Sequence, residues 1–261
     1  MAKKQKQTSK APPKRKPQFD IETSPLFTPI VFVVIFLGLV VLFSDFLFSD
    51  DMLYGSDTIQ AGVYFRSFLV DHVGAHGEVP RWNPYIFGGM PYIEAFHGDI
   101  FYPLSVLKFF GSIYRMLGMN LFLHIFLAGL FMYFCARQFK LEKIPALVAA
   151  VAYMYTGYLI SLVAPGHDGK IYVTALFPLV ILFLDRGFER RPMLNFSLLG
   201  LVIGVIILSP HPQMSYYMLW VVALYAAFKL IVLYADSRQI APLVKPALLT
   251  TYAVVIGLLI S

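Results

Sequence analysis

The sequence is poor in charged residues and in cysteine. Only 14% of its 261 residues are charged, while 58% are hydrophobic, which lies outside the usual range for a soluble globular domain. The chain is therefore expected to be an integral membrane protein. Its single cysteine, Cys135, excludes an intramolecular disulfide.

Acidic residues are absent from the first 18 residues, which carry seven Lys and Arg. The rest of the chain has 14 basic and 15 acidic residues, so the net charge of +6 belongs to this tail and does not indicate a nucleic-acid-binding body. The tail also lacks a small-residue cleavage pattern after a short apolar core, which argues against a signal peptide. We expect residues 1–24 to be a disordered cytoplasmic leader.

Long apolar runs are abundant. A membrane span needs about 20 mostly apolar residues. Seven runs qualify, the fourth being short: Pro25 to Phe48, Met119 to Ala136, Ile144 to Val163, Ile171 to Leu184, Met193 to Ser209, Gln213 to Leu233 and Pro242 to Ser261. The predicted fold is an all-α membrane domain over residues 25–261 with about seven transmembrane helices.

Basic residues alternate between the turns that join these runs. The turns after the second, fourth and sixth runs hold Arg137, Lys140, Lys143, Arg186, Arg190, Arg191 and Arg238. Lys170 is the only base in the two short turns of the opposite side. Because short cytoplasmic loops carry the excess of Lys and Arg, the amino terminus is predicted inside and a long loop, about residues 49–118, outside.

Two surface helices are predicted in this outer loop. Asp57 and Thr58 can cap a helix that ends at Gly74, and Pro103 precedes a second helix over Leu104 to Leu117. The first helix is expected to lie along the membrane surface. In the second, Lys108 and Arg115 are expected to reach lipid headgroups.

The segment between the helices reads PRWNPYIFGGMPYIEAFHGDIFYP. Its Gly and Pro residues favour turns, and its Trp and Tyr residues suit the membrane interface, Trp82 as an anchor. We interpret the segment as a lid and wall of a groove, with Glu94, His97 and Asp99 facing the groove. The alternative is a cover that only packs over helix ends.

The two short outer turns hold further polar side chains. APGHDGK places His167, Asp168 and Lys170 close to the bilayer, and SPHPQ does the same for His211 and Gln213. Proton-handling side chains at this depth are commonly functional, although solvated turn residues are the alternative. Four outer segments offer acid, imidazole or amine on one face, and this convergence favours a functional site.

Three stretches carry a resemblance to a known family: PRWNPYIFGGMPYIEAFHGDIFYPL, AYMYTGYLISLVAPGHDGKIYVTALFPLVIL and HPQMSYY. They resemble the YfhO family of bacterial polytopic membrane proteins, which is similar to the GT-C glycosyltransferases. The resemblance covers nearly everything after the basic tail. Members are normally longer, so the chain is expected to be a fragment that lacks later spans, and such a fragment need not be active alone.

The resemblance implies transfer of a sugar from a polyprenyl-phosphate donor to a cell-envelope acceptor, at the outer side of the bacterial cytoplasmic membrane. It implies a functional acid near the start of the outer loop, matched by Asp57 with Asp50 and Asp51 as alternatives. It also implies a second polar site, matched by Asp168 and His167. This second turn lacks a D-x-D or E-x-D pattern, so a divalent metal ion remains an open possibility.

The expected chemistry gives each side chain a role. Asp57 accepts the proton of the acceptor hydroxyl, and Lys170, His167 or His211 stabilises the departing phosphate. Two other classes stay open, a non-catalytic lipid-linked-sugar binding or flippase-like accessory protein, and a transporter. A transporter would carry ionisable residues near mid-membrane. Asp45 and His124, which we place inside spans, both lie near the predicted outer ends.

Overall fold

The computed structural model describes residues 24–95 and 99–261. The predicted leader, except for its last residue, and the predicted groove residue His97 lie outside the described residues. Among the described residues, five helical segments are long and apolar enough to cross a membrane. Four of them are single helices: α4 (Ile113–Gln138), α7 (Asp168–Glu189), α9 (Pro212–Ser237) and α10 (Ala241–Ile260). The fifth, Lys143–Ser161, consists of helix α5 (Lys143–Met154) and helix α6 (Gly157–Ser161). The prediction of an all-α, multi-pass membrane protein is confirmed at this level.

Two further apolar helices coincide with the first and fifth predicted spans. Helix α1 covers Phe27–Leu42 and helix α8 covers Pro192–Ile207, and both are shorter than the other five. Each has 16 residues, against the roughly 20 that a span needs. The short helix α2, Ser44–Leu47, follows α1. A total of seven spans therefore stays a prediction.

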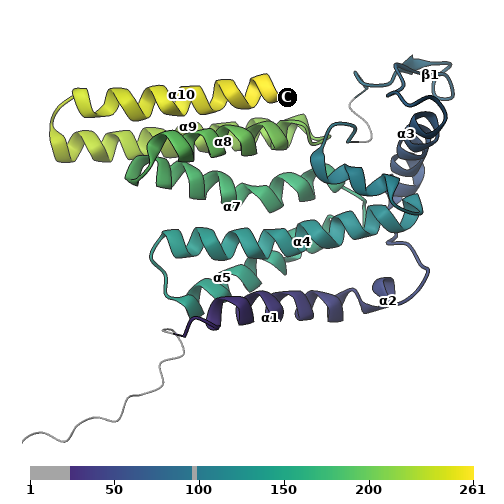
Figure 1. Ribbon diagram of the computed structural model, residues 1–261, viewed down its shortest axis with the longest axis horizontal. Helices are drawn as coiled ribbons and strands as arrows, with labels where there is room; N and C mark the ends of the chain where they lie inside the picture. Colours follow the sequence, from purple (N-terminus) through teal and green to yellow (C-terminus); the bar gives the residue numbers. More distant parts are fainter. Residues whose placement is uncertain (1–23, 96–98) are drawn as a thin grey trace, which may run out of the picture.

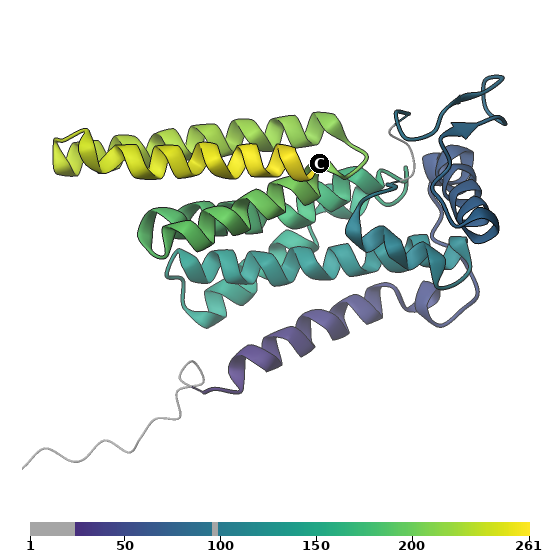
Figure 2. The ribbon, with the colours of Figure 1, turned by 45° about the horizontal axis from the view of Figure 1, so that its top comes forward.

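The long helices run side by side in one bundle (Figure 1). Helices α4 and α7 form its centre, with 56% and 61% of their most apolar windows buried, against 17% and 11% for α9 and α10. Helix α1 packs on α4 and α5, while α8 packs on α7 and α10. In Figure 2, α1 and the pair α9 and α10 lie on opposite sides of this centre.

Small residues bring α8 and α10 together. Gly200 and Gly204 lie one turn apart on α8 and face Ala253 and Gly257 of α10. A Cβ atom at Gly200 would lie 2.8 Å from the carbonyl oxygen of Ala253. This small-xxx-small pattern on both helices allows the close backbone approach that is typical of helix pairs in membranes.

One end of the bundle is covered by the long loop, and we call it the α3 end. A π-helical turn, Thr58–Gly62 (η2), leads into helix α3, Val63–His76, which lies across the ends of the other helices (Figure 1). The helix continues past the predicted stop at Gly74 and ends at Gly77, which adopts the left-handed conformation with φ of 73°. Asp57 makes no side-chain capping bond there, contrary to the prediction.

The second predicted surface helix, Leu104 to Leu117, is wrong in its extent. A 3₁₀ helix, Pro103–Phe109 (η3), is followed by a break, and α4 already begins at Ile113 rather than at the predicted Met119. The break falls at Gly111 and Ser112, since Ser112 adopts an extended conformation with ψ of 131°. The apolar residues that follow it continue directly into the span.

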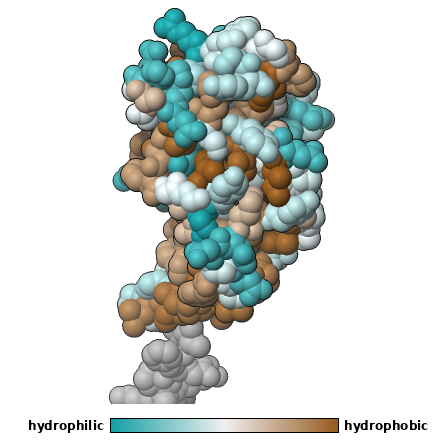
Figure 3. Space-filling view, turned by 90° about the vertical axis from the view of Figure 1, so that its right-hand side faces the viewer, coloured by the Kyte–Doolittle hydropathy of each residue, from teal (hydrophilic) through white to brown (hydrophobic). Residues whose placement is uncertain are grey.

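A small two-stranded sheet lies beside α3 and belongs to the Pro80 to Pro103 segment. Strand β1, Trp82–Asn83, pairs antiparallel with β2, Met90–Pro91. The buried Tyr92 ring packs against Phe65, and its hydroxyl donates to the carbonyl oxygen of Phe65 at 2.6 Å. This contact attaches the segment to α3. Figure 3 shows the α3 end as a mixed surface, in which hydrophilic and hydrophobic side chains alternate.

Candidate functional site

A cavity of about 390 Å³ lies at the α3 end, where three segments that are distant in the sequence meet. They are the start of the loop helix, the turn between α6 and α7, and the turn between α8 and α9. Five of the predicted site residues line it: Asp57, His167, Asp168, Lys170 and His211. Asp57 and Asp168, which lie more than a hundred positions apart in the chain, thus share one cavity.

Backbone contacts bring the first two segments together. The amide of Asp57 donates to the carbonyl oxygen of Pro165 at 2.9 Å, and the amide of Ser56 donates to that of Ala164 at 3.3 Å. Gly166 allows this approach because it adopts φ of 80° and because a Cβ atom there would lie 2.8 Å from the amide nitrogen of Thr58. The turn that carries His167 and Asp168 is therefore held against the residue that follows Asp57.

His167 links the predicted general base to the lysine. Its Nε2 atom lies 3.3 Å from Oδ2 of Asp57, and its Nδ1 atom lies 3.2 Å from Nζ of Lys170. Because an ammonium group only donates hydrogen bonds, Nδ1 is the acceptor in this contact. Nε2 then carries the ring proton that points to Asp57.

Asp168, the first residue of α7, is almost fully buried, with 6% of its surface exposed. Its Oδ2 atom accepts from Nη2 of Arg66 at 2.9 Å. Its Oδ1 atom has no hydrogen-bond partner among the described residues. A buried carboxylate oxygen in this state costs free energy unless a donor reaches it, and the cavity that Asp168 lines is the place from which a ligand hydroxyl can do so.

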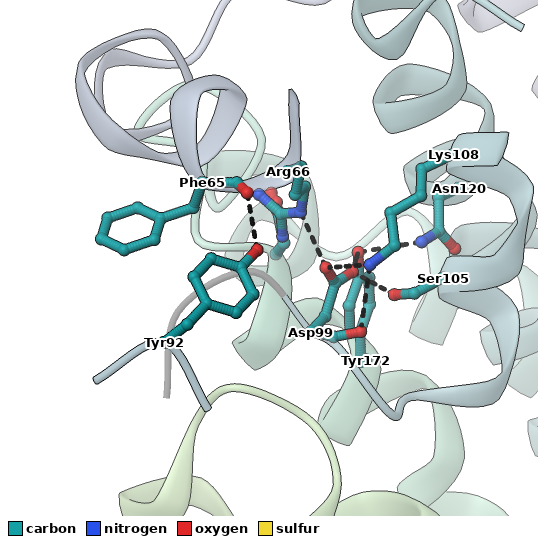
Figure 4. A network of polar contacts seen from close by, with 9 residues as sticks. Phe65, Arg66, Tyr92, Asp99, Ser105, Lys108, Asn120 and Tyr172 are labelled. Atoms are coloured by element: carbon teal, nitrogen blue, oxygen red, sulfur yellow. Dashed lines mark hydrogen bonds and ion pairs between the residues drawn. The ribbon is translucent and has the colours of Figure 1, made fainter. Parts of the chain in front are cut away.

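Arg66 connects the cavity to a buried polar network (Figure 4). Its Nε atom donates to Oδ1 of Asp99 at 2.8 Å, while Nη2 reaches Asp168, so one guanidinium joins two carboxylates. Nζ of Lys108 lies 3.4 Å from the same Asp99 oxygen, and the Ser105 hydroxyl donates to Oδ2. Two basic and two acidic side chains thus balance their charges inside the protein.

The charges in this network shift the pKa values of its loop members. Burial by itself would raise the pKa of Asp99, but the charges of Arg66 and Lys108, with hydrogen bonds from Arg66 and Ser105, outweigh burial and hold that pKa below its ordinary value. Burial opposes the charge of Arg66 as well, yet Asp99 and Asp168 together raise its pKa. Both shifts favour the charged forms of Asp99 and Arg66. At Lys108 burial has the larger effect, and it lowers the pKa despite the nearby charge of Asp99.

An aromatic group supports the network from the bundle side. Tyr172 donates to Oδ2 of Asp99 at 3.3 Å and stacks on Tyr102, with ring centroids 4.6 Å apart and planes 8° apart. Nδ1 of His124 faces the carbonyl oxygen of Asn120 at 2.7 Å, and Nε2 faces the hydroxyl of Tyr102 at 2.6 Å. A carbonyl only accepts, so Nδ1 of His124 carries a proton and donates it to this bond.

His211 forms the third wall of the cavity. Its Nδ1 atom accepts from the amide of Met214 at 3.3 Å and so caps the start of α9. Burial, and then the nearby charge of Lys170, lowers the pKa of His211 below its ordinary value. The shift favours the neutral ring at pH 7, and an anion bound next to it would favour its protonation.

The remaining predicted residues lie elsewhere. Gln213 is exposed and donates to the Tyr217 hydroxyl at 2.8 Å. Glu94 is exposed and lines a different cavity, also of about 390 Å³, together with Asp99. Trp82 is 54% exposed and packs over Gly89. Asp50 and Asp51, the alternatives to Asp57, are exposed and do not line the Asp57 cavity.

Asp99 lines this second cavity and is largely buried. It was predicted to face a groove as a ligand-binding acid, but only 3% of its surface is exposed, and both of its carboxylate oxygens are engaged inside the protein. Its side chain positions Arg66, which in turn holds Asp168. Sequence reasoning missed Arg66 and Lys108, because each is a single basic residue within an apolar helical segment.

A second polar network, also missed, lies at the other end of the bundle. Oδ1 of Asp185 accepts from Nζ of Lys229 and from the hydroxyl of Tyr225, both at 2.8 Å. Oδ2 accepts from Nε2 of Gln138 at 2.8 Å, so the network joins α4, α7 and α9. Asp185 lies 17 residues beyond Asp168 on α7, about 25 Å along a helix. These ionisable residues are therefore separate from the cavity.

No group of three or more His, Cys, Asp or Glu side chains converges as a metal site in residues 24–95 and 99–261. The residues present do not by themselves form a protein cage for the divalent ion that the sequence left open. Comparisons with family models, with curated proteins and with solved structures give no match. The geometry of the site therefore carries the functional argument alone.

Proposed function

We propose that the protein is a membrane glycosyltransferase that moves a sugar from a polyprenyl-phosphate donor to an extracytoplasmic acceptor. One observation carries the proposal: a cavity at the end of an apolar helical bundle combines two carboxylates, two imidazoles and an amine, and one buried carboxylate oxygen of Asp168 lacks a partner among the described residues. A lipid-linked sugar phosphate presents hydroxyl donors and a negative charge at the membrane surface, which matches this set of groups.

The proposal includes the finer topology. In this topology helices α1 and α8 are the two remaining spans. Because they are short, they lie nearly perpendicular to the membrane plane, and residues that flank each helix complete the crossing. The amino terminus faces the cytoplasm of a bacterial cell, and the α3 end faces outward. The supporting pattern is that the turns rich in Lys and Arg lie at the end opposite to α3, as the positive-inside rule requires for cytoplasmic loops.

The proposed reaction is a displacement at the anomeric carbon of the donor sugar. The acceptor hydroxyl oxygen attacks this carbon, and its proton moves to the carboxylate of Asp57. The bond between the anomeric carbon and the phosphate oxygen breaks, and polyprenyl phosphate leaves with the electron pair. Asp57 suits the role of base because 58% of its side chain is exposed, so that an acceptor can reach it.

The other cavity residues have distinct roles in this scheme. Oδ1 of Asp168 accepts a hydrogen bond from a sugar hydroxyl, while Arg66 fixes the other oxygen. Lys170 and His211 face the phosphate, whose negative charge grows as the bond breaks. His167 donates a hydrogen bond from Nε2 to Oδ2 of Asp57 and so orients the carboxylate of the base.

Two alternatives remain. An accessory protein, either one that binds lipid-linked sugars or one that resembles a flippase, would use the same cavity without catalysing a reaction. A transporter would move its substrate through the bundle. For the transporter, Asp185 and Lys229 are ionisable groups within the helices, but they are paired at 2.8 Å and join α7 to α9. This pairing favours a structural role. The accessory protein is therefore the stronger alternative, and an Asp57 variant separates it from the enzyme.

The test is an assay of the full chain in nanodiscs with a panel of polyprenyl-phosphate sugars. Asp57→Asn should reduce transfer by about 100-fold or more, the usual contribution of a general base, and should leave binding of the lipid-linked sugar within about twofold. Asp50→Asn is the matched control, because Asp50 is exposed outside the cavity. Lipid-linked-sugar binding by the wild type without transfer from any donor would favour the accessory protein.

A further inference from the structure

A groove of about 910 Å³ lies between α3 and the Asn83 to Phe87 part of the turn-rich segment. It lies in the upper part of the range of about 300–1,000 Å³ that is usual for small-molecule sites. It is distinct from the Asp57 cavity, but Ala61 and Phe65 line both. The two cavities therefore lie next to each other along the same helix.

Aromatic rings form a large part of the groove. Tyr85 and Phe87 are 81% and 92% exposed, and Tyr64 on α3 is 62% exposed. Phe68 meets Tyr85 edge to face, with ring centroids 5.8 Å apart. Rings that stay this exposed beside a groove forgo the free energy of burying their apolar surface in the fold. They are available to cover the apolar face of a ligand.

The backbone of the segment holds these rings in place. Phe87 adopts φ of 53°, and Gly88 and Gly89 follow with φ of 75° and 116°. The amide of Gly89 donates to the carbonyl oxygen of Ile86 at 2.8 Å, which closes the turn. A left-handed conformation is unfavourable for a phenylalanine, so the fold maintains an exposed ring at the groove against a local cost.

The polar lining determines the chemical class of the ligand. Gln60, Asp71, His72, His76 and Asn83 line the groove, and they supply both donors and acceptors. No Lys or Arg belongs to the described residues that line it. A phosphate or carboxylate ligand would meet the Asp71 carboxylate with no Lys or Arg among the described lining residues, so the lining fits an uncharged polyol better than an anionic one.

We propose that this groove binds a neutral saccharide and is the acceptor subsite of the protein. A pyranose ring has an apolar face of C–H groups that packs on aromatic rings, and a rim of hydroxyls that needs donors and acceptors together. The groove offers both, and its shared wall with the Asp57 cavity places the saccharide beside the predicted base. The role as acceptor subsite rests on the proposed function; the binding of a saccharide does not.

Binding is tested on the full chain in nanodiscs without any donor, by isothermal titration with chitotetraose, maltotetraose and mannotetraose, and with tetragalacturonate as the anionic probe. At least one neutral tetrasaccharide should bind, and tetragalacturonate should bind at least tenfold more weakly. Tyr85→Ala and Phe87→Ala should each weaken binding at least tenfold. Phe110→Ala is the matched control, because this ring is 75% exposed but lies outside the groove.

Three outcomes would overturn the inference: no binding of any neutral tetrasaccharide, a preference for tetragalacturonate, or binding that the two aromatic variants leave unchanged. Gln60→Ala, which removes a side chain at an exposed helical position, should weaken binding without the risk of disturbing the turn. Because these measurements need no transfer, they are independent of the proposed chemistry. Saccharide binding that Asp57→Asn retains would support the groove even if no donor gave transfer.

Discussion

Arg66 is the residue on which the candidate site depends most. With 4% of its surface exposed, it separates two carboxylates that would otherwise repel each other inside the protein. Breaking a buried ion pair by removing one partner leaves an uncompensated charge, which is much more destabilising than the pair is stabilising. The side chain therefore has a structural role first, and through that role it orients Oδ2 of Asp168.

We predict that Arg66→Ala lowers the free energy of unfolding by about 3–5 kcal/mol, the usual cost of breaking a buried pair. Thermal unfolding in detergent, followed by circular dichroism, measures the change. Arg81→Ala is the control, because Arg81 is exposed in the same loop and its loss should change stability by no more than about 0.5 kcal/mol. Equal effects of the two substitutions would contradict the ion-pair assignment.

The lowered pKa of Asp99 predicts a specific pH dependence. A carboxyl with a lower pKa in the folded state stabilises the fold above its unfolded pKa, about 3.9, and this contribution is lost as the pH falls through the lower folded value. Asp99→Asn should therefore be less stable than the wild type at pH 7, and the difference should shrink below about pH 4. Melting temperatures at a series of pH values test this, and a constant difference down to pH 3 would contradict it.

At the scale of elements, the site depends on the contact between the α6–α7 turn and the start of the loop helix. Gly166 is at the centre of this contact, with φ of 80° and no room for a Cβ atom beside Thr58. An alanine there would be strained in both respects. The strain would be relieved by moving the turn that carries His167 and Asp168 away from Asp57.

Gly166→Ala should lower the free energy of unfolding by more than about 1 kcal/mol and should reduce binding of a polyprenyl-phosphate sugar. Gly74→Ala is the matched control: Gly74 is helical with open space around it, so alanine should stabilise α3 by about 0.5–1 kcal/mol. Thermal unfolding and lipid binding of both variants provide the comparison. A neutral Gly166→Ala would show that the turn tolerates displacement.

The elements themselves follow largely from local patterns. Runs of apolar residues predicted the bundle, because a helix that crosses a membrane needs an uninterrupted apolar surface. Element ends were less certain: Gly74 and Gly77 are both plausible helix stops, and only Gly77 adopts the left-handed conformation. A pattern along one segment does not show which of two glycines the packing will use.

Side-chain partners could not be predicted, because they depend on how the helices assemble. Asp99 looked like an exposed acid in a polar loop, and its burial arises only when α3, η3 and α7 close around it. Asp57 and Asp168 were both placed on the outer face beside predicted spans, and they line one cavity. Depth in a membrane is readable from a sequence, whereas the lateral order of helices is not.

For the whole molecule, the two polar networks lie at opposite ends of α4 and α7. One joins Arg66 and Asp99 at the α3 end, and the other joins Gln138, Asp185 and Lys229. Between them the helices are held mainly by apolar packing. Polar contacts therefore join the helices at both ends of the bundle, and the Asp57 cavity lies at one of these ends.

Orientation in the membrane is the prediction on which the proposed function depends, because the proposed acceptor is extracytoplasmic. In a Cys135→Ser background, single cysteines at Ala75 and Glu142 report on the two ends, since both positions are exposed. The alternation of basic turns predicts that an impermeant thiol reagent labels position 75 in intact cells and labels position 142 only after the membrane is opened. Labelling of position 142 alone in intact cells would put the Asp57 cavity, and the groove between α3 and the Asn83 to Phe87 segment, on the cytoplasmic side. An extracytoplasmic transferase would then be ruled out.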